Sequence, residues 1–430
     1  MNSERESLTR AIGTVGLAAG IVNVMIGGGI FRVPALAAAS LGAAAPVAYV
    51  ICAVAMALIV ACIAAAGRRV TLTGGPYAYV GTTLGPYAGF ISGVLLWMIG
   101  VFATAAVSSV MAASVTELLG LSGRAVHIVI LVAAFGFWSI VNMRGVTLGV
   151  RLNTTITVAK LLPLVLIAVA GLFFVRAENL AVTAWPAAGE FARMSLILVF
   201  AFAGIEVALI PSGEVRDPGR TVPRAIVLAM VGVTILYIVL QIVAQGILGA
   251  ALPQSAVPLA DAAGASLGSW GRSLLLAGAA ISMFGHLGGM TLAIPRIVYA
   301  LARDGFLPRA LSSVHPVYRS PQLAIVTQSI ITLLLAITST FEQLAVIANV
   351  AALALYLGCA AAAWKLGQSP IVPLLACGVI AWLLTGLNLD EWLAFGACLL
   401  VASIVYVARR SAAAASGPAQ NAKSGPGADY

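Results

Sequence analysis

The stretch Met25-Ile26-Gly27-Gly28-Gly29-Ile30-Phe31 lies near the middle of the first long apolar run of this 430-residue chain. Each glycine costs about 1 kcal/mol relative to alanine inside a helix, so three in a row predict a helix break. An unpaired backbone group in hydrocarbon is costly, and a break is tolerated only where protein covers it or where it lines a polar cavity. The triple glycine is therefore a candidate ligand site.

The composition indicates an integral membrane protein. Hydrophobic residues make up 61% of the chain and charged residues only 9%, against about 45–50% and 25% in an average soluble protein. The net charge of +9 is therefore not read as a nucleic-acid footprint, and no nucleic-acid partner is expected.

The first ten residues are polar, and no cleavable signal peptide is expected after them. The cysteines lie inside apolar runs without metal-like spacing, so neither a metal nor another cofactor is expected: Cys52, Cys62, Cys359, Cys377 and Cys398.

The apolar runs predict an all-α chain that crosses the membrane twelve times, since a helix needs roughly 20 apolar residues to span a bilayer core. The expected spans are 12–41, 45–66, 87–118, 124–143, 150–175, 191–212, 224–249, 271–300, 321–340, 343–364, 370–388 and 391–408. Residues 1–11 form a short cytoplasmic N-terminus, and residues 411–430, rich in Ala, Ser, Gly and Pro, form a tail expected to be disordered.

Charge placement predicts the orientation. With the N-terminus in the cytoplasm, sixteen Lys and Arg residues outside the spans or at their ends fall on the inner side and four on the outer side. This asymmetry follows the positive-inside rule and predicts that both termini are cytoplasmic.

A second candidate break lies in the sixth span, at Phe200-Ala201-Phe202-Ala203-Gly204-Ile205-Glu206. Gly204 alone could serve only close helix packing. It lies five helices after the triple glycine, however, and an inverted five-plus-five repeat requires that spacing between paired broken helices. The pairing favours a functional break.

Five motifs occur in an order that resembles the amino acid–polyamine–organocation (APC) superfamily. They are Gly27 to Phe31 with Pro34, Gly74 to Tyr79, Asn142 to Gly145 with Lys160, Phe200 to Glu206 with Glu214 to Pro218 and Pro223, and Arg296 with Ala302 to Pro308. The resemblance implies a LeuT-like fold that moves amino acids or related amines by alternating access. It also implies two inverted repeats, 12–175 and 191–364, with helices 1 and 6 broken and with peripheral helices over 370–408.

The two breaks predict how an amino acid would be held. Amides of Gly28, Gly29 and Ile30, at the positive start of a half-helix, suit the α-carboxylate. Carbonyls at Phe202, Ala203 and Gly204, where the other half-helix ends, suit the α-ammonium group. The simpler alternative is that the glycines only let helices cross closely. The resemblance adds Phe200 as a gate and Met290 as a pocket residue. The full set of substrate-binding candidates is Ile26, Gly28, Gly29, Ile30, Phe200, Phe202, Ala203, Gly204 and Met290.

Four ionisable residues are candidates for coupling. Lys160 lies nine residues past Arg151, about 14 Å along a helix and so near the bilayer midplane. A lone ammonium there is a functional candidate, since desolvation lowers the pKa of a lysine; a static structural cation is the alternative. In some APC members a lysine on this helix resembles a replacement for sodium.

Glu206, Arg32 and His286 have roles that stay open. Glu206 could be a proton site, a counter-charge or part of a gate. Arg32 could face the outer vestibule, pair with Glu206 or favour an acidic substrate group. His286 could be a packed histidine or a proton site, and imidazole is a poor ligand for sodium.

The leading hypothesis is a secondary amino acid transporter of the cell membrane, proton-coupled, sodium-independent and selective for neutral amino acids. The alternative is an exchanger for cationic amino acids or polyamines. A channel or a membrane sensor is disfavoured because the sequence has neither repeated pore motifs nor a soluble output domain. The sequence shows no constellation of catalytic residues, so an enzyme is not expected, and no ATP-binding motif. The oligomeric state is left open.

Overall fold

The computed structural model describes residues 13–69, 76–144, 161–205, 217–318 and 320–415. Every regular element in these ranges is helical. The α-helices are α1 (Thr14–Met25), α2 (Gly29–Leu41), α3 (Ala45–Arg69), α4 (Pro76–Leu84), α5 (Pro86–Leu118), α6 (Arg124–Met143), α8 (Leu161–Ala170), α9 (Ala188–Phe202), α11 (Pro218–Leu248), α12 (Pro258–Leu267), α13 (Ser269–Arg303), α14 (Gln322–Thr338), α15 (Phe341–Lys365), α16 (Ile371–Leu384) and α17 (Leu389–Ala415). The short 3₁₀ segments are η1 (Gly42–Ala44), η2 (Gly171–Phe174), η3 (Ala177–Leu180), η5 (Gly249–Gln254) and η6 (Arg309–Ser312).

Seven helical segments in the described ranges are long and apolar enough to cross a membrane. They are Gly29–Gly67, Pro86–Leu118, Arg124–Met143, Arg220–Gln254, Ser269–Arg303, Phe341–Lys365 and Leu389–Ser411. Three shorter apolar helices accompany them: Leu161–Phe174, Gln322–Thr338 and Ile371–Leu384. The first long segment contains a turn, because η1 separates α2 from α3 and Gly42 there has φ 53°. The fold is thus that of a multi-pass helical membrane protein.

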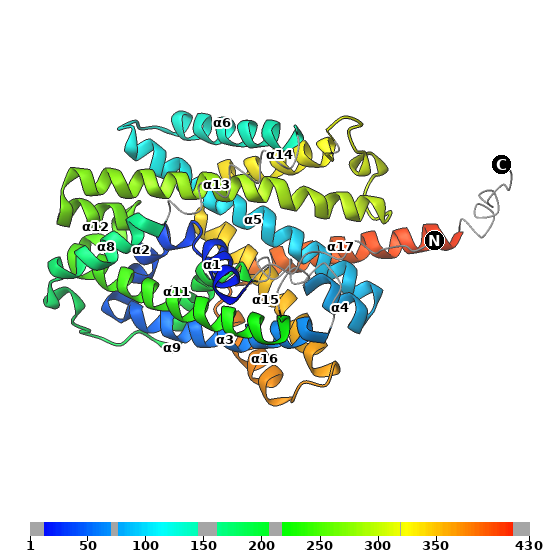
Figure 1. The fold of residues 1–430 in the computed structure, drawn as a ribbon, viewed down its shortest axis with the longest axis horizontal. Helices are drawn as coiled ribbons and strands as arrows, with labels where there is room; N and C mark the ends of the chain where they lie inside the picture. Colours follow the sequence, from blue (N-terminus) through cyan, green and yellow to red (C-terminus); the bar gives the residue numbers. More distant parts are fainter. Residues whose placement is uncertain (1–12, 70–75, 145–160, 206–216, 319, 416–430) are drawn as a thin grey trace.

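The long helices run side by side along the long axis of the molecule (Figure 1). Helix α5 lies at the centre, with its most extensive packing against α15 and α13. Helices α1, α3, α9 and α11 pack together on one side of this centre, and α17 lies at the margin. Helix α15 is buried along most of its length, so the interior is built around a central layer of α5 and α15.

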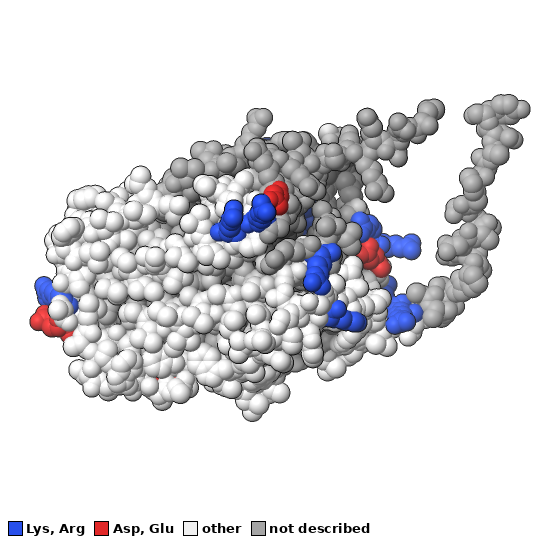
Figure 2. Space-filling view, turned by 60° about the horizontal axis from the view of Figure 1, so that its bottom comes forward, with Lys and Arg blue, Asp and Glu red and all other residues white. Residues whose placement is uncertain are grey.

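Charged side chains leave a broad zone of the surface uncharged. On the face in Figure 2, a small cluster of both signs lies at the left end and another lies near the middle, with more Lys and Arg to its right; a broad uncharged zone lies between the left end and the middle. An uncharged zone of this kind is what a bilayer requires of the surface that faces lipid.

Candidate functional site

The first helical run is interrupted at the triple glycine. Helix α1 ends at Met25 and α2 begins at Gly29. Between them Ile26 has φ −77° and ψ 78°, outside the helical region. The Gly27 amide donates to the carbonyl of Met25 at 2.8 Å, a tight turn in place of a helical bond. The first amides of a helix have no acceptor within it and carry its positive end. The start of α2 is therefore able to receive an anion.

The three glycines differ in how closely other helices approach them. A Cβ on Gly28 would lie 3.0 Å from Val107 of α5, and a Cβ on Gly29 would lie 3.2 Å from the Cα of Ala201 in α9. Those two glycines let neighbouring helices approach closely. A Cβ on Gly27 would meet nothing nearer than Nδ1 of His286, at 3.9 Å. Close packing thus accounts for Gly28 and Gly29, while Gly27 faces open space.

The sixth predicted span is also interrupted. Helix α9 ends at Phe202, and Ala203 is extended, with its amide donating to the carbonyl of Val199 at 2.8 Å. Gly204 has φ 110°, a conformation that side-chain-bearing residues rarely adopt. The glycine is therefore required by the backbone path itself.

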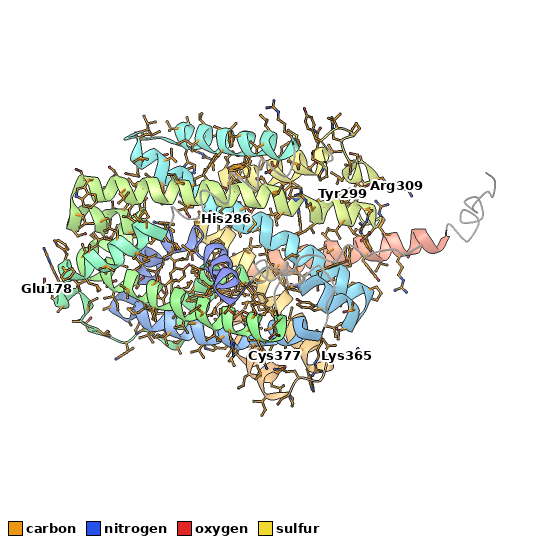
Figure 3. The ribbon with its side chains drawn as sticks, in the orientation of Figure 1. Glu178, His286, Tyr299, Arg309, Lys365 and Cys377 are labelled. Atoms are coloured by element: carbon orange, nitrogen blue, oxygen red, sulfur yellow. The ribbon has the colours of Figure 1, made fainter. Side chains whose placement is uncertain are left out.

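The two interruptions border one cavity of about 70 Å³. Predicted residues on its wall are Gly28, Gly29, Phe200, Ala203, Gly204, His286 and Met290, and Gly27 lies beside them. His286 lies about midway along α13 (Figure 3). Ile26, Ile30 and Phe202 are buried but do not line the cavity. The ring of Phe200 lies edge-on to that of Phe341, with centroids 5.3 Å apart.

Two walls of this cavity were not predicted from the sequence. Helix α5 contributes small residues, including Gly100 and Ala103, and α15 contributes Ala348, Asn349 and Ala352. The Asn349 amide nitrogen donates to the carbonyl of Leu196 in α9 at 2.7 Å. A buried asparagine in an otherwise apolar span was the available sequence signal. Small residues recur throughout this chain, so those of α5 gave none.

Tyr237 of α11 links the two interrupted helices. Its hydroxyl lies 3.1 Å from the carbonyl of Met25, at the end of α1, and 3.1 Å from that of Ala201, in the last turn of α9. Its ring is wholly buried and lies edge-on to Phe202, with centroids 5.4 Å apart. The last carbonyls of a helix have no donor within it. The Met25 carbonyl also accepts from the Gly27 amide. Tyr237 therefore contacts the ends of both helices and holds the two breaks together.

Arg32 lies outside the cavity. Its guanidinium donates to the carbonyl of Ser255 at 2.6 Å. The hydroxyl of Ser255 in turn donates to Asp261, which accepts from Arg272 at 3.1 Å. Arg32 is thus tied to the connection between η5 and α12, and it is not among the residues that line the cavity.

Lys160 and Glu206, the two other coupling candidates, lie outside the described residues. Their predicted roles stay predictions.

The comparisons with known proteins agree with this architecture. Residues 12–415 match the family model described as amino acid permease. The chain is 29% identical over 358 residues to the serine/threonine exchanger of Bacillus subtilis, covering 80% of each chain. It is 25% identical to the methylthioribose transporter and 24% identical to the branched-chain amino acid permease of the same organism, each over 94% of both chains. This chain therefore belongs to the amino acid permease family.

Proposed function

We propose that this chain is a secondary active transporter that carries neutral amino acids across the cell membrane by alternating access. The observation that carries the proposal is the cavity bordered by both helix interruptions, Gly27–Gly29 on one side and Ala203–Gly204 on the other. Backbone groups at a helix break can bind the α-carboxylate and α-ammonium groups that all amino acids share.

In this proposal the α-carboxylate binds the amides of Gly28 and Gly29, which line the cavity where α2 begins and the helix end is positive. The α-ammonium group binds a carbonyl at the end of α9. Tyr237 already bonds the carbonyl of Ala201, so the carbonyl of Ala203, which lines the cavity, is the acceptor for the substrate. Phe200 covers the substrate from one side as a gate.

The substrate side chain is small and neutral. The described residues on the wall include no carboxylate; His286 and Asn349 are their polar side chains. The cavity of about 70 Å³ is less than half of the roughly 150 Å³ in which an engineered apolar cavity holds benzene. The relative named as a serine/threonine exchanger supports a small substrate, whereas nothing on the described wall supports a cationic one.

The proposal includes coupling to protons without sodium, with Lys160 and His286 as candidates and with Glu206 as a possible counter-charge. It also includes twelve membrane helices, a LeuT-like inverted repeat over 12–175 and 191–364, and both termini in the cytoplasm. If Lys160→Ala keeps pH-dependent uptake with unchanged affinity, the lysine has no part in coupling.

Uptake into proteoliposomes tests the function. The panel holds all common amino acids, polyamines and methylthioribose, each with and without an inward proton gradient and with and without sodium. We expect saturable uptake of small neutral amino acids that the proton gradient stimulates and sodium does not change. Uptake of polyamines alone, or of methylthioribose alone, would overturn the substrate class, and sodium-dependent uptake would overturn the coupling.

A further inference from the structure

A second and much larger cavity lies on the other side of α5. It has a volume of about 660 Å³ and lies between α5, α13, α14 and α17, with the segment before and within η6 as a further wall. Its volume falls within the roughly 300–1,000 Å³ typical of small-molecule sites. It shares no described wall residue with the cavity at the helix breaks.

The wall of this cavity offers an occupant almost no polar group. Its polar side chains include Gln328, which accepts from the indole of Trp97 at 2.8 Å and donates to Thr332 at 3.0 Å. Those groups are therefore occupied within the protein. Val401 of α17 is part of the wall and is 60% exposed, so the cavity reaches the surface that faces lipid. An aliphatic chain fits such a wall.

One end of the cavity changes from apolar to aromatic to basic. The wall residue Phe306 stacks on Tyr406 of α17, with centroids 5.8 Å apart. The exposed Arg309 lies in η6, which contains the wall residue Leu311, and the exposed Arg409 lies in α17 three residues after Tyr406. Arg409 follows the wall residue Val405 by four positions and so shares its helix face. From Val401 to Arg409 the helix rises about 12 Å. Hydrocarbon, interface and headgroup layers follow one another in this order.

The two arginines lie at the end of the molecule where basic residues gather. Figure 3 shows Arg309 near the right-hand end, beyond the stretch of α13 that carries Tyr299. The C-terminal part of α17 lies at the same end (Figure 1), where Figure 2 shows most of the blue side chains. Basic residues placed beside a groove between membrane helices bind anionic headgroups.

We propose that this cavity binds one acyl chain of an anionic phospholipid, with the phosphate held by Arg309 and Arg409. Bilayer lipid is as apolar as the wall, so the apolar cavity alone gives no preference over bulk lipid. The arginines make the site selective, and the cavity fixes the lipid in one place. The proposal does not depend on what the protein transports.

The test is native mass spectrometry of the purified full-length protein, with phosphatidylglycerol or phosphatidylcholine added back after delipidation. We expect one phosphatidylglycerol to stay bound to the wild type while phosphatidylcholine does not. In Cys398→Trp the larger side chain on the wall fills part of the cavity, so the bound lipid is lost. Leu400→Trp, on the opposite, exposed face of α17, keeps it. A headgroup contact is worth about 1 kcal/mol per arginine, so Arg309→Gln and Arg409→Gln each weaken phosphatidylglycerol binding about fivefold.

Arg410→Gln is the matched control for the headgroup, because Arg410 lies on another face of α17. It keeps wild-type binding. Equal retention of both lipids by the wild type, or unchanged retention in Cys398→Trp, would overturn the proposal. Retention of a polypeptide mass in place of lipid would overturn it as well, since the cavity would then receive a partner helix. A circular-dichroism melt of each variant identifies any that fail to fold, and Ala397→Leu then replaces Cys398→Trp as the filling variant.

Discussion

The two cavities on either side of α5 differ in the hydrogen-bonding groups that their walls offer, and this difference does not follow their volumes. The cavity at the helix breaks is about 70 Å³, and the one beside α17 is about 660 Å³. The small one is bordered by two helix ends, whose backbone groups lack partners within the helices. The large one has a wall in which Gln328 and Trp97 bond each other. Under the proposed function, the backbone groups at the helix ends, and not the size of the cavity, identify the site for an amino acid.

The two walls also differ in the kind of ligand that each can select. Backbone amides and carbonyls at helix ends recognise the charged groups shared by all amino acids, and they need a fixed backbone path to do so. An apolar wall recognises only shape. Changes to the backbone path are accordingly expected to affect transport most.

The largest effect is expected at Gly29. In Gly29→Val the added Cβ lies 3.1 Å from Cδ1 of Phe200 and 3.2 Å from the Cα of Ala201, so α2 and α9 must separate. Overpacking of this kind costs about 1–3 kcal/mol, and we expect uptake per molecule to fall about tenfold or more. Gly27→Ala is the control, since its Cβ has room, and it keeps most of the uptake. Equal uptake by the two variants would contradict the account.

The next effect is expected at Tyr237. Tyr237→Phe removes the hydroxyl bonded to Met25 and Ala201, and a buried carbonyl left without a donor costs about 1–3 kcal/mol. Met25 keeps its bond from Gly27, so the loss falls on the end of α9. We expect KM for the substrate to rise about tenfold.

Tyr49→Phe is the matched control for Tyr237, because it removes a buried bond, to Gln241 at 3.0 Å, that touches neither break. It lowers thermal stability and leaves KM unchanged. If both variants shift KM equally, Tyr237 has only a structural role.

A smaller effect is expected at Asn349. Asn349→Ala removes the bond to the carbonyl of Leu196, whose net value is about 1 kcal/mol, and KM should rise about fivefold. Asn142→Ala provides the comparison. Asn142 is buried and bonds Gly288 at 3.3 Å but does not line the cavity. Transport kinetics that respond more to Asn142 than to Asn349 would move the site away from α15.

The smallest effect is expected at Arg32, which bonds Ser255 outside the cavity. Arg32→Gln should leave the preference for neutral over acidic amino acids unchanged in a competition assay. A loss of acidic-substrate binding in this variant would place Arg32 in the substrate site after all.

The sequence predicted the membrane class because composition alone decides it, and the match to the amino acid permease family confirmed the resemblance seen in five motifs. The predicted residues Gly28, Gly29, Phe200, Ala203, Gly204 and Met290 line one cavity. Three consecutive glycines are costly inside a helix, so they identify such a break. The count of twelve spans stays a prediction, since seven long apolar segments occur in the described ranges.

Other parts of the site could not be predicted, for a physical reason. Tyr237 and Asn349 bond residues 36 and 153 positions away. The asparagine in its apolar span was a signal, but one sequence does not show which distant residue either side chain contacts. Ile26, Ile30 and Phe202 belong to the predicted motifs but pack behind the cavity wall. Sequence identifies where a helix breaks, and only the fold identifies which side of the break faces the ligand.

The most direct test of the central claim, that substrate binds at the helix breaks, uses both cavities at once. Gly27→Cys puts a thiol in the small cavity, and the native Cys398 lies on the wall of the large one. Alkylation of both is followed by peptide mass spectrometry in vesicles that take up serine. The account predicts that saturating serine slows labelling at position 27 and leaves Cys398 unchanged. Unchanged labelling at position 27, in vesicles that transport serine, would contradict it.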